Sequence, residues 1–172
     1  PGSFSDVFDK VLNQLYQLYN QSIFIGNDSN DSSTDVVINE DYEGTPSPWY
    51  SRQLIRILRY KATWSYEELS KIDSVAMSLF NRTGEKLSIR PALSYFIVFS
   101  EMVSLLSMIP ISGYTITRCA TTLARYLEND RMTMIYFAFD SLNQLLRTNP
   151  QITSSIESCR STLYKLIHSD DS

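Results

Sequence analysis

The sequence predicts an all-α fold, a single globular bundle of about seven helices around a central apolar helix at about residues 91–109. Three observations support this prediction. Apolar residues recur at intervals of three and four along most of the chain, which is the spacing of an amphipathic helix. No segment alternates apolar and polar residues over the length of a strand. With 172 residues, of which 43% are hydrophobic, the chain has the length of one domain and enough apolar side chains for a core.

The N-terminal residues predict a first helix. We expect residues 1–3 to be the scar of a cleaved expression tag, a single helical domain to cover 4–168 and a tail to cover 169–172. From Phe4 the apolar residues keep helical spacing, and the pattern is lost near Gly26. These residues are Phe4, Val7, Phe8, Val11, Leu12, Leu15, Tyr16, Leu18 and Tyr19.

Residues 27–47 differ in composition from the rest of the chain. They hold six acidic residues, no basic residue and many Ser, Thr and Asn side chains. Such a segment cannot bury enough apolar surface to offset the entropy lost on ordering it. We therefore expect a long, disordered acidic loop after the first helix.

A second helix is expected from Pro48 to about Ala62, because a capping serine followed by proline is typical of a helix start. On a helical wheel, one face carries Tyr50, Leu54, Ile57 and Leu58. The opposite face carries Arg52, Arg56 and Arg59. Ser65 and Glu68 have the spacing of a capping box and predict the start of a third helix. Gly84 is expected to end it.

The segment from Pro91 to Ile111 is apolar on nearly all sides of a helix, and Glu101 is its one charged residue. A helix of this kind is surrounded by other helices. Four serines within it and prolines near both ends favour the central helix of a soluble core over a membrane span.

Three more helices complete the predicted bundle. Thr115 or Thr117 is expected to cap the fifth, which places Ile116, Cys119, Ala120, Leu123 and Leu127 inside. The apolar residues that predict the sixth are Met132, Ile135, Tyr136, Phe139, Leu142 and Leu146. Those that predict the seventh are Ile152, Ile156, Cys159, Leu163 and Ile167.

The composition argues against catalysis. The one histidine, His168, lies near the C-terminus, and the chain has no glycine-rich phosphate loop and no nucleophile elbow. We therefore expect no enzyme activity, no cofactor and no metal site. Cys119 and Cys159 are expected to be reduced core residues, which favours an intracellular protein of the nucleus or cytoplasm.

Charge is unevenly distributed and points to a binding surface. Residues 1–48 carry a net charge of -7, whereas residues 49–172 carry +3. Spacings of four and three place the arginines of the second helix on one side, where they suit phosphates or an acidic partner, including the acidic loop itself. Aromatic residues that anchor protein interfaces cluster around the same helix. The expected partner-binding residues are Trp49, Arg52, Arg56, Arg59, Tyr60 and Trp64.

The acidic loop holds two further candidate motifs. Its β-branched run followed by acids resembles a SUMO-interacting motif, which adds a strand to a sheet edge. The residues of that run are Val36, Val37, Ile38, Glu40 and Asp41. Thr45 and Ser47 each precede a proline and are candidate phosphorylation sites, and a phosphate on Ser47 would lie at a helix N-terminus.

The order of elements, an amphipathic helix, a long acidic loop, further helices and a central apolar helix, resembles in outline the B-cell-lymphoma-type apoptosis regulators. That family carries an Asn-Trp-Gly-Arg-like signature at the start of its central helix. Here the region reads Ser88-Ile89-Arg90-Pro91-Ala92, without Trp or Gly, so the resemblance is one of architecture alone.

The leading hypothesis is a non-enzymatic scaffold or adaptor domain of a eukaryotic multi-protein complex, which binds partner peptides through an aromatic and basic helical surface. One alternative is a nucleic-acid-binding helical module that uses Arg52, Arg56 and Arg59. Another is a viral groove-type modulator of apoptosis or signalling.

Overall fold

A computed structural model describes residues 4–20, 41–42, 45–84, 93–128, 131–159 and 164 of the chain. The protein is all-helical, as predicted: these ranges form six α-helices, one 3-10 helix and one pair of two-residue strands. None of the helices in these ranges is long and apolar enough to cross a membrane. Contacts divide the chain into an N-terminal unit, Pro1–Leu105, and a C-terminal unit, Leu106–Ser172. The single domain expected from the sequence stays a prediction.

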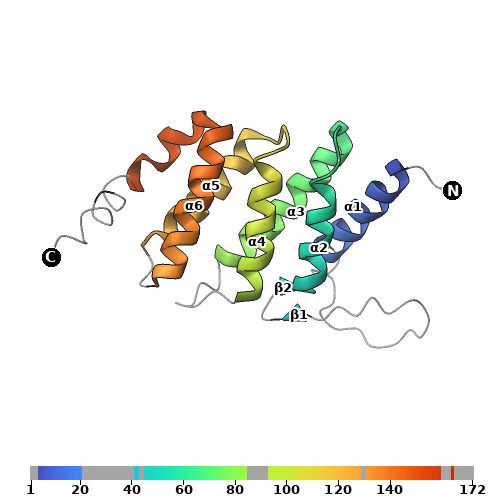
Figure 1. Ribbon diagram of the computed structural model, residues 1–172, viewed down its shortest axis with the longest axis horizontal. Coiled ribbons are helices and arrows are strands. Elements are labelled where there is room, and N and C mark those ends of the chain that lie inside the picture. The colour runs from blue at the N-terminus through green and yellow to red at the C-terminus, as the bar shows by residue number, and fades with distance from the viewer. Residues whose placement is uncertain are drawn as a thin grey trace. The chain divides into compact units, whose positions relative to one another are not determined.

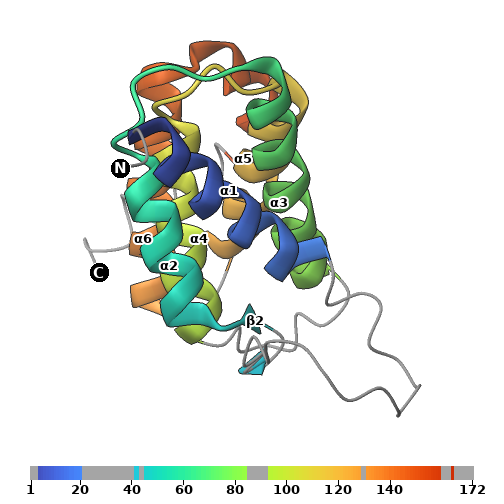
Figure 2. The ribbon, with the colours of Figure 1, turned by 90° about the vertical axis from the view of Figure 1, so that its right-hand side faces the viewer.

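The N-terminal unit is built on α1 (Phe4–Asn20), which packs against both α2 (Pro48–Leu58) and α3 (Tyr66–Gly84). Figures 1 and 2 show α1 running obliquely across these two helices. Its buried side consists of Val11, Leu12, Leu15, Leu18 and Tyr19, all taken from the predicted apolar set. The first helix is therefore confirmed.

A short hairpin leads into α2. Strands β1 (Asp41–Tyr42) and β2 (Thr45–Pro46) pair antiparallel, with Tyr42 opposite Thr45. The sequence does not predict this hairpin, because two residues a strand are too few for an alternating pattern to show. Most of the expected disordered loop, residues 27–40 and 43–44, lies outside the described residues.

The start of α2 differs in detail from the prediction. Pro48 is the first helical residue, and the Ser47 carbonyl accepts a hydrogen bond from the Ser51 amide at 2.8 Å. The Ser47 side chain makes no capping hydrogen bond, because its backbone adopts a left-handed conformation with φ of 35°. The helix also ends at Leu58 rather than near Ala62, with Arg59 at its C-cap.

The capping box at the start of α3 is confirmed. The Ser65 amide donates to Glu68 Oε2 at 2.7 Å, and the Glu68 amide donates to Ser65 Oγ at 3.3 Å. The helix continues to Gly84, as its glycine predicts. Reciprocal capping therefore determines where α3 begins.

Helix α4 (Leu93–Leu106) ends three residues before the predicted helix at 91–109, and residues 91–92 lie outside the described residues. Its buried residues extend over most of its circumference, and they include an aromatic cluster. The Phe99 ring stacks on Tyr95 at 5.3 Å and meets Phe80 of α3 edge to face at 5.4 Å. These contacts tie α4 to α3 within the N-terminal unit.

The C-terminal unit consists of α5 (Gly113–Tyr126), α6 (Met132–Thr148) and the 3-10 helix η2 (Pro150–Cys159), which pack against one another. The predicted core residues of α5 are all buried. Its predicted cap is wrong: Ser112 is the N-cap, and its Oγ accepts a hydrogen bond from the Thr115 amide at 3.2 Å. Thr115 itself is buried inside the first turn, and Thr117 lies beyond it.

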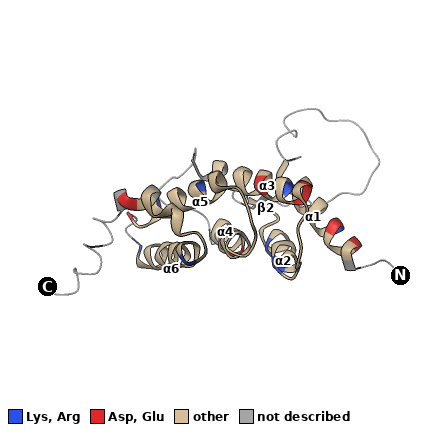
Figure 3. Ribbon diagram, turned by 90° about the horizontal axis from the view of Figure 1, so that it is seen from above, with Lys and Arg blue, Asp and Glu red and all other residues tan. Residues whose placement is uncertain are grey.

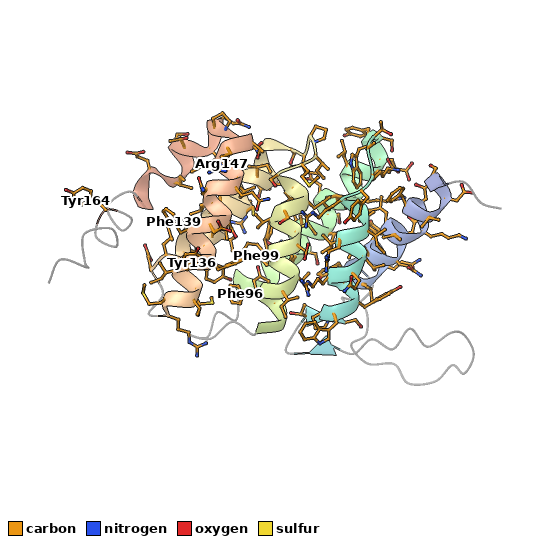
Figure 4. The ribbon with its side chains drawn as sticks, in the orientation of Figure 1. Phe96, Phe99, Tyr136, Phe139, Arg147 and Tyr164 are labelled. Atoms are coloured by element: carbon orange, nitrogen blue, oxygen red, sulfur yellow. The ribbon has the colours of Figure 1, made fainter. Side chains whose placement is uncertain are left out.

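The sixth helix exists, but it buries a different face from the one that its largest apolar residues suggest. Its buried residues are Met134, Ala138, Ser141, Leu142 and Leu145. Met132, Tyr136 and Phe139 are exposed instead, and Figure 4 labels the last two. The described part of the predicted seventh helix is the 3-10 helix η2, whose residues are rich in Ser and Thr and so favour the α-helix weakly.

Candidate functional site

Three arginines of the second helical segment surround one carboxylate of α4. Arg52 Nε donates to Glu101 Oε1 at 3.2 Å, and Arg59 Nη1 donates to Glu101 Oε2 at 3.0 Å. Arg56 Nε lies 3.8 Å from Glu101 Oε1, within ion-pair distance but too far for a hydrogen bond. We call Arg52, Arg56, Arg59 and Glu101 the arginine cluster.

The arginine cluster has an excess of positive charge. Three guanidiniums face one carboxylate, so the cluster carries about two unbalanced positive charges. The Glu101 side chain is 11% exposed, whereas those of Arg52 and Arg59 are half-buried and that of Arg56 is 48% exposed. Figure 3 shows basic residues on α2 and acidic residues on α1. The excess charge therefore reaches solvent mainly through Arg56.

Glu101 is the residue of the arginine cluster that the sequence did not predict as part of a site. The sequence predicted that Arg52, Arg56 and Arg59 face a ligand or the acidic loop. In the structure Arg52 and Arg59 pair with Glu101 of α4. A signal was present: Glu101 is the one charge in an apolar segment, and a buried charge needs a partner of opposite sign. What the sequence could not supply is which basic residues lie opposite it.

An exposed ridge runs along the solvent side of α2, next to the cluster. Trp49, Gln53 and Arg56 are spaced by four and three residues, so that they lie in a row along the helix, and Tyr60 follows four residues later. Trp49 is 61% exposed and Tyr60, just beyond the helix end, is 83% exposed. We call these four residues the aromatic ridge. Arg56 belongs to both the ridge and the cluster.

Tyr50 lies toward α1, and Ile57 is exposed. The Tyr50 hydroxyl donates to Gln14 Oε1 on α1 at 2.9 Å, and both side chains are part-exposed. Leu54, Ile55 and Leu58 form the buried side of α2. The predicted apolar face of this helix is therefore confirmed for Leu54 and Leu58, which are buried, and wrong for Tyr50 and Ile57, which are exposed.

Trp64 does not join the ridge. Its half-buried ring lies 5.8 Å from Lys61 Nζ, and the Phe8 ring lies 5.6 Å from the same nitrogen. Lys61 Nζ also contacts Glu68 Oε1 at 2.6 Å. The structure thus brings together five of the six predicted partner-binding residues, Trp49, Arg52, Arg56, Arg59 and Tyr60, and leaves Trp64 with Lys61.

Glu68 is held in its charged form. Burial acts to raise the pKa of its carboxyl, but hydrogen bonds from the Lys61 ammonium and from Ser65, together with the Lys61 charge, outweigh burial. The net result lowers the pKa of Glu68 from 4.5 to about 2. Glu68 therefore ties the loop after α2 to the first turn of α3.

A polar hollow of about 330 Å³ lies between α1 and the start of α3. Its walls include Asp9, Asn13, Glu67, Glu68 and Lys71. These groups already bind one another: Lys71 Nζ lies 3.0 Å from Glu67 Oε1 and donates to Asn13 Oδ1 at 3.1 Å. The polar groups around the hollow are therefore already paired with one another. The exposed surface of α2 is the stronger candidate site because it still has charge and aromatic side chains available to a partner.

The loop motifs lie mostly outside the described residues. Val36, Val37, Ile38 and Glu40 are not described, and Asp41 belongs to β1. Thr45 is 2% exposed, so a kinase would need the hairpin to open before it reached this hydroxyl. Ser47 is half-buried at the start of α2. Both phosphorylation sites stay predictions.

The part of the chain that the structure describes holds no group of three or more His, Cys, Asp or Glu side chains placed to bind a metal. Cys119 is a buried free thiol, and burial raises its pKa. Comparison with known proteins gives no match to any protein-family model and none to a curated protein sequence.

Proposed function

We propose that this protein is a non-enzymatic helical interaction domain, a scaffold or adaptor that binds a segment of a partner protein through α2. The observation that carries the proposal is the aromatic ridge, in which Trp49 and Tyr60 lie exposed on either side of Arg56. Trp, Tyr and Arg are the residues most enriched among interface hot spots. Large aromatic side chains that lie exposed on one side of a helix are typical of surfaces that bind another protein.

The charge beside the ridge favours an acidic partner segment. Two unbalanced positive charges speed the encounter with an acidic peptide and set its register, while the aromatic side chains supply buried area. The single histidine of the sequence supports binding over acid–base catalysis.

Substitutions on the ridge test this proposal. Trp49→Ala and Tyr60→Ala are each expected to weaken partner binding about tenfold or more, as hot-spot truncations do. Binding is measured by quantitative pull-down from the native source with nuclease present. Tyr66→Ala is the matched control, because Tyr66 is a highly exposed tyrosine of α3 that does not belong to the ridge. Equal recovery of every protein by all four forms of the chain would contradict the proposal.

Nucleic-acid binding through the same arginines is the second candidate. The alternation of Trp49, Arg56 and Tyr60 favours it, because base stacking on aromatic side chains combines with backbone contacts in single-strand binders. It predicts binding that falls steeply with salt concentration. Loss of every partner after nuclease treatment would support it over the scaffold proposal.

We also propose that the chain is a domain of about seven helices with α4 as its central helix, inside the cell in the nucleus or cytoplasm. Burial over most of the α4 surface supports a central position for this helix. The buried free thiol of Cys119 suits a reducing compartment.

A further inference from the structure

We propose that the arginine cluster is a binding site for a phosphorylated side chain of the partner segment. This inference rests on the proposed function, since it names the chemical group that docks beside the aromatic ridge. Its starting point is the concentration of charge: three guanidiniums lie within 3.0–3.8 Å of the oxygens of one carboxylate.

The hydrogen bonds of the cluster leave Arg56 available. Glu101 uses one oxygen for Arg52 and the other for Arg59. Arg56 remains beyond hydrogen-bond distance of that carboxylate, and its side chain is the most exposed of the three. A guanidinium has five N–H donors in a planar fork, which fits two oxygens of one phosphate.

The amount of charge favours a phosphate over a carboxylate. A phosphorylated side chain carries about -1.5 to -2 charges at neutral pH on one tetrahedral group. That charge matches the excess of two at the cluster, whereas a single carboxylate would leave about one positive charge unbalanced.

The surroundings favour a protein segment over a nucleic acid. A nucleic acid needs a basic track that follows several phosphates. Here the neighbouring helices carry exposed acids, among them Asp6 and Asp9 on α1 and Glu67 on α3. These acids interrupt a continuous basic track around the cluster, so the cluster suits one anionic group.

Glu101 is a positioning residue in this site. By bonding to Arg52 and Arg59, it orders two long side chains before any ligand arrives, which lowers the entropy lost on binding. Its burial keeps its own negative charge behind the guanidiniums.

The separation of the two aromatic residues of the ridge indicates how long the bound peptide segment is. Trp49 and Tyr60 are separated by eleven positions, about 16 Å along a helix, with Arg56 between them. An extended peptide covers that distance in about five residues. We therefore expect a phosphorylated residue flanked by apolar side chains that contact the two aromatic rings.

Two degenerate nonapeptide libraries test the inference with the full chain. One library has phosphoserine fixed at its centre, and the other has serine there. The full chain is expected to retain the phosphorylated library about tenfold better, since hydrogen bonds between guanidinium and phosphate are charge-assisted and those to a serine hydroxyl are weaker. Inorganic phosphate at millimolar concentration is expected to compete.

Arg56→Gln is expected to abolish the difference between the libraries without changing the thermal midpoint, because Arg56 makes no hydrogen bond to Glu101. Arg147→Gln is the matched control, since it removes one exposed arginine from α6. Figure 4 shows Arg147 near the end of that helix. Loss of phosphopeptide binding in this control would overturn the inference.

Other outcomes separate this inference from the proposed function. Equal retention of both libraries, reduced in both by Trp49→Ala, would overturn the phosphate site and leave the ridge as a protein-binding surface. A library with glutamate at its centre that binds as well as the phosphorylated one would also overturn it. So would a single-stranded oligothymidine that binds more tightly than the phosphopeptides, or the failure of both libraries to bind.

Discussion

At the scale of single residues, Glu101 connects the stability of the N-terminal unit to its candidate site. A carboxylate that is 11% exposed must be balanced by opposite charge and hydrogen bonds, and two arginines provide both. The same contacts hold these arginines beside the exposed Arg56. A change at Glu101 therefore affects both the fold and the binding surface.

Glu101→Gln is expected to lower the free energy of unfolding by about 1–3 kcal/mol, because two charge-assisted hydrogen bonds are weakened. The loss stays below that of a fully buried pair, since water reaches the half-buried Arg52 and Arg59. Urea unfolding followed by circular dichroism measures it. Asp140→Asn, which removes an exposed carboxylate of α6, is expected to change the stability by less than about 0.5 kcal/mol.

Glu68 makes stability depend on pH. Its pKa is about 2 in the folded chain and 4.5 in its ordinary state, so the folded form binds its proton less readily than the unfolded form. The stabilisation is complete above about pH 4.5 and is lost as the pH falls toward 2. In Glu68→Gln this contribution, at most about 3 kcal/mol, is expected to disappear from the acid limb of the stability curve.

Thermal unfolding between pH 7 and pH 2.5 checks the Glu68 prediction. Glu67→Gln is the control, because the adjacent Glu67 carboxylate is 80% exposed and pairs with Lys71 at the surface. If both variants kept the same acid dependence as the parent chain, the ion pair between Lys61 and Glu68 would not stabilise the fold as its distance suggests.

At the scale of elements, local chemistry decides where the helices begin. Ser65 and Glu68 satisfy each other's exposed groups at the start of α3, and Pro48 starts α2. These signals depend on residues within one turn, so they can be read in the sequence. At α5 the expected caps, Thr115 and Thr117, both lie inside the helix, and Ser112 caps it instead.

Ser112→Ala is expected to destabilise the chain by about 1 kcal/mol, because the Thr115 amide loses its acceptor. Thr117→Ala is expected to change the stability by less than about 0.5 kcal/mol, since Thr117 lies inside the helix and does not cap it. Parallel chemical denaturation of the two variants compares them directly. A larger loss in Thr117→Ala would contradict the assignment of Ser112 as the cap.

Which face of a helix is buried is less predictable than its start. In α6 the large residues Met132, Tyr136 and Phe139 have helical spacing, yet the smaller face with Ala138 and Ser141 is packed. Small side chains let neighbouring helices approach closely, and this preference depends on the shape of the neighbour. Hydrophobic spacing alone therefore identifies the helix but not its orientation.

At the scale of the whole molecule, the coupling between the two units can be tested. If the chain unfolds as a single cooperative domain, a core mutation in one unit also destabilises the other. Cys119 reports on the C-terminal unit, because its thiol is fully buried and its pKa is raised by burial.

Phe80→Ala in the N-terminal unit is expected to accelerate labelling of Cys119 about 100-fold or more, since loss of a buried Phe destabilises a domain by about 3–5 kcal/mol. The rate is measured with a thiol reagent on chains that also carry Cys159→Ser. Ser100→Ala, at an exposed position of α4, is expected to leave it unchanged. An unchanged rate in Phe80→Ala would show that the units open independently.

The sequence by itself determined the helical class, the first helix, the capping box of α3 and the apolar core of α5. Each depends on interactions between residues a few positions apart. Only the tertiary structure decided that Glu101 is the partner of the three arginines. The same is true of the exposure of Trp49 and Tyr60 on either side of Arg56. Those outcomes depend on which surfaces of distant segments meet, because charge pairing and burial are properties of neighbours in space.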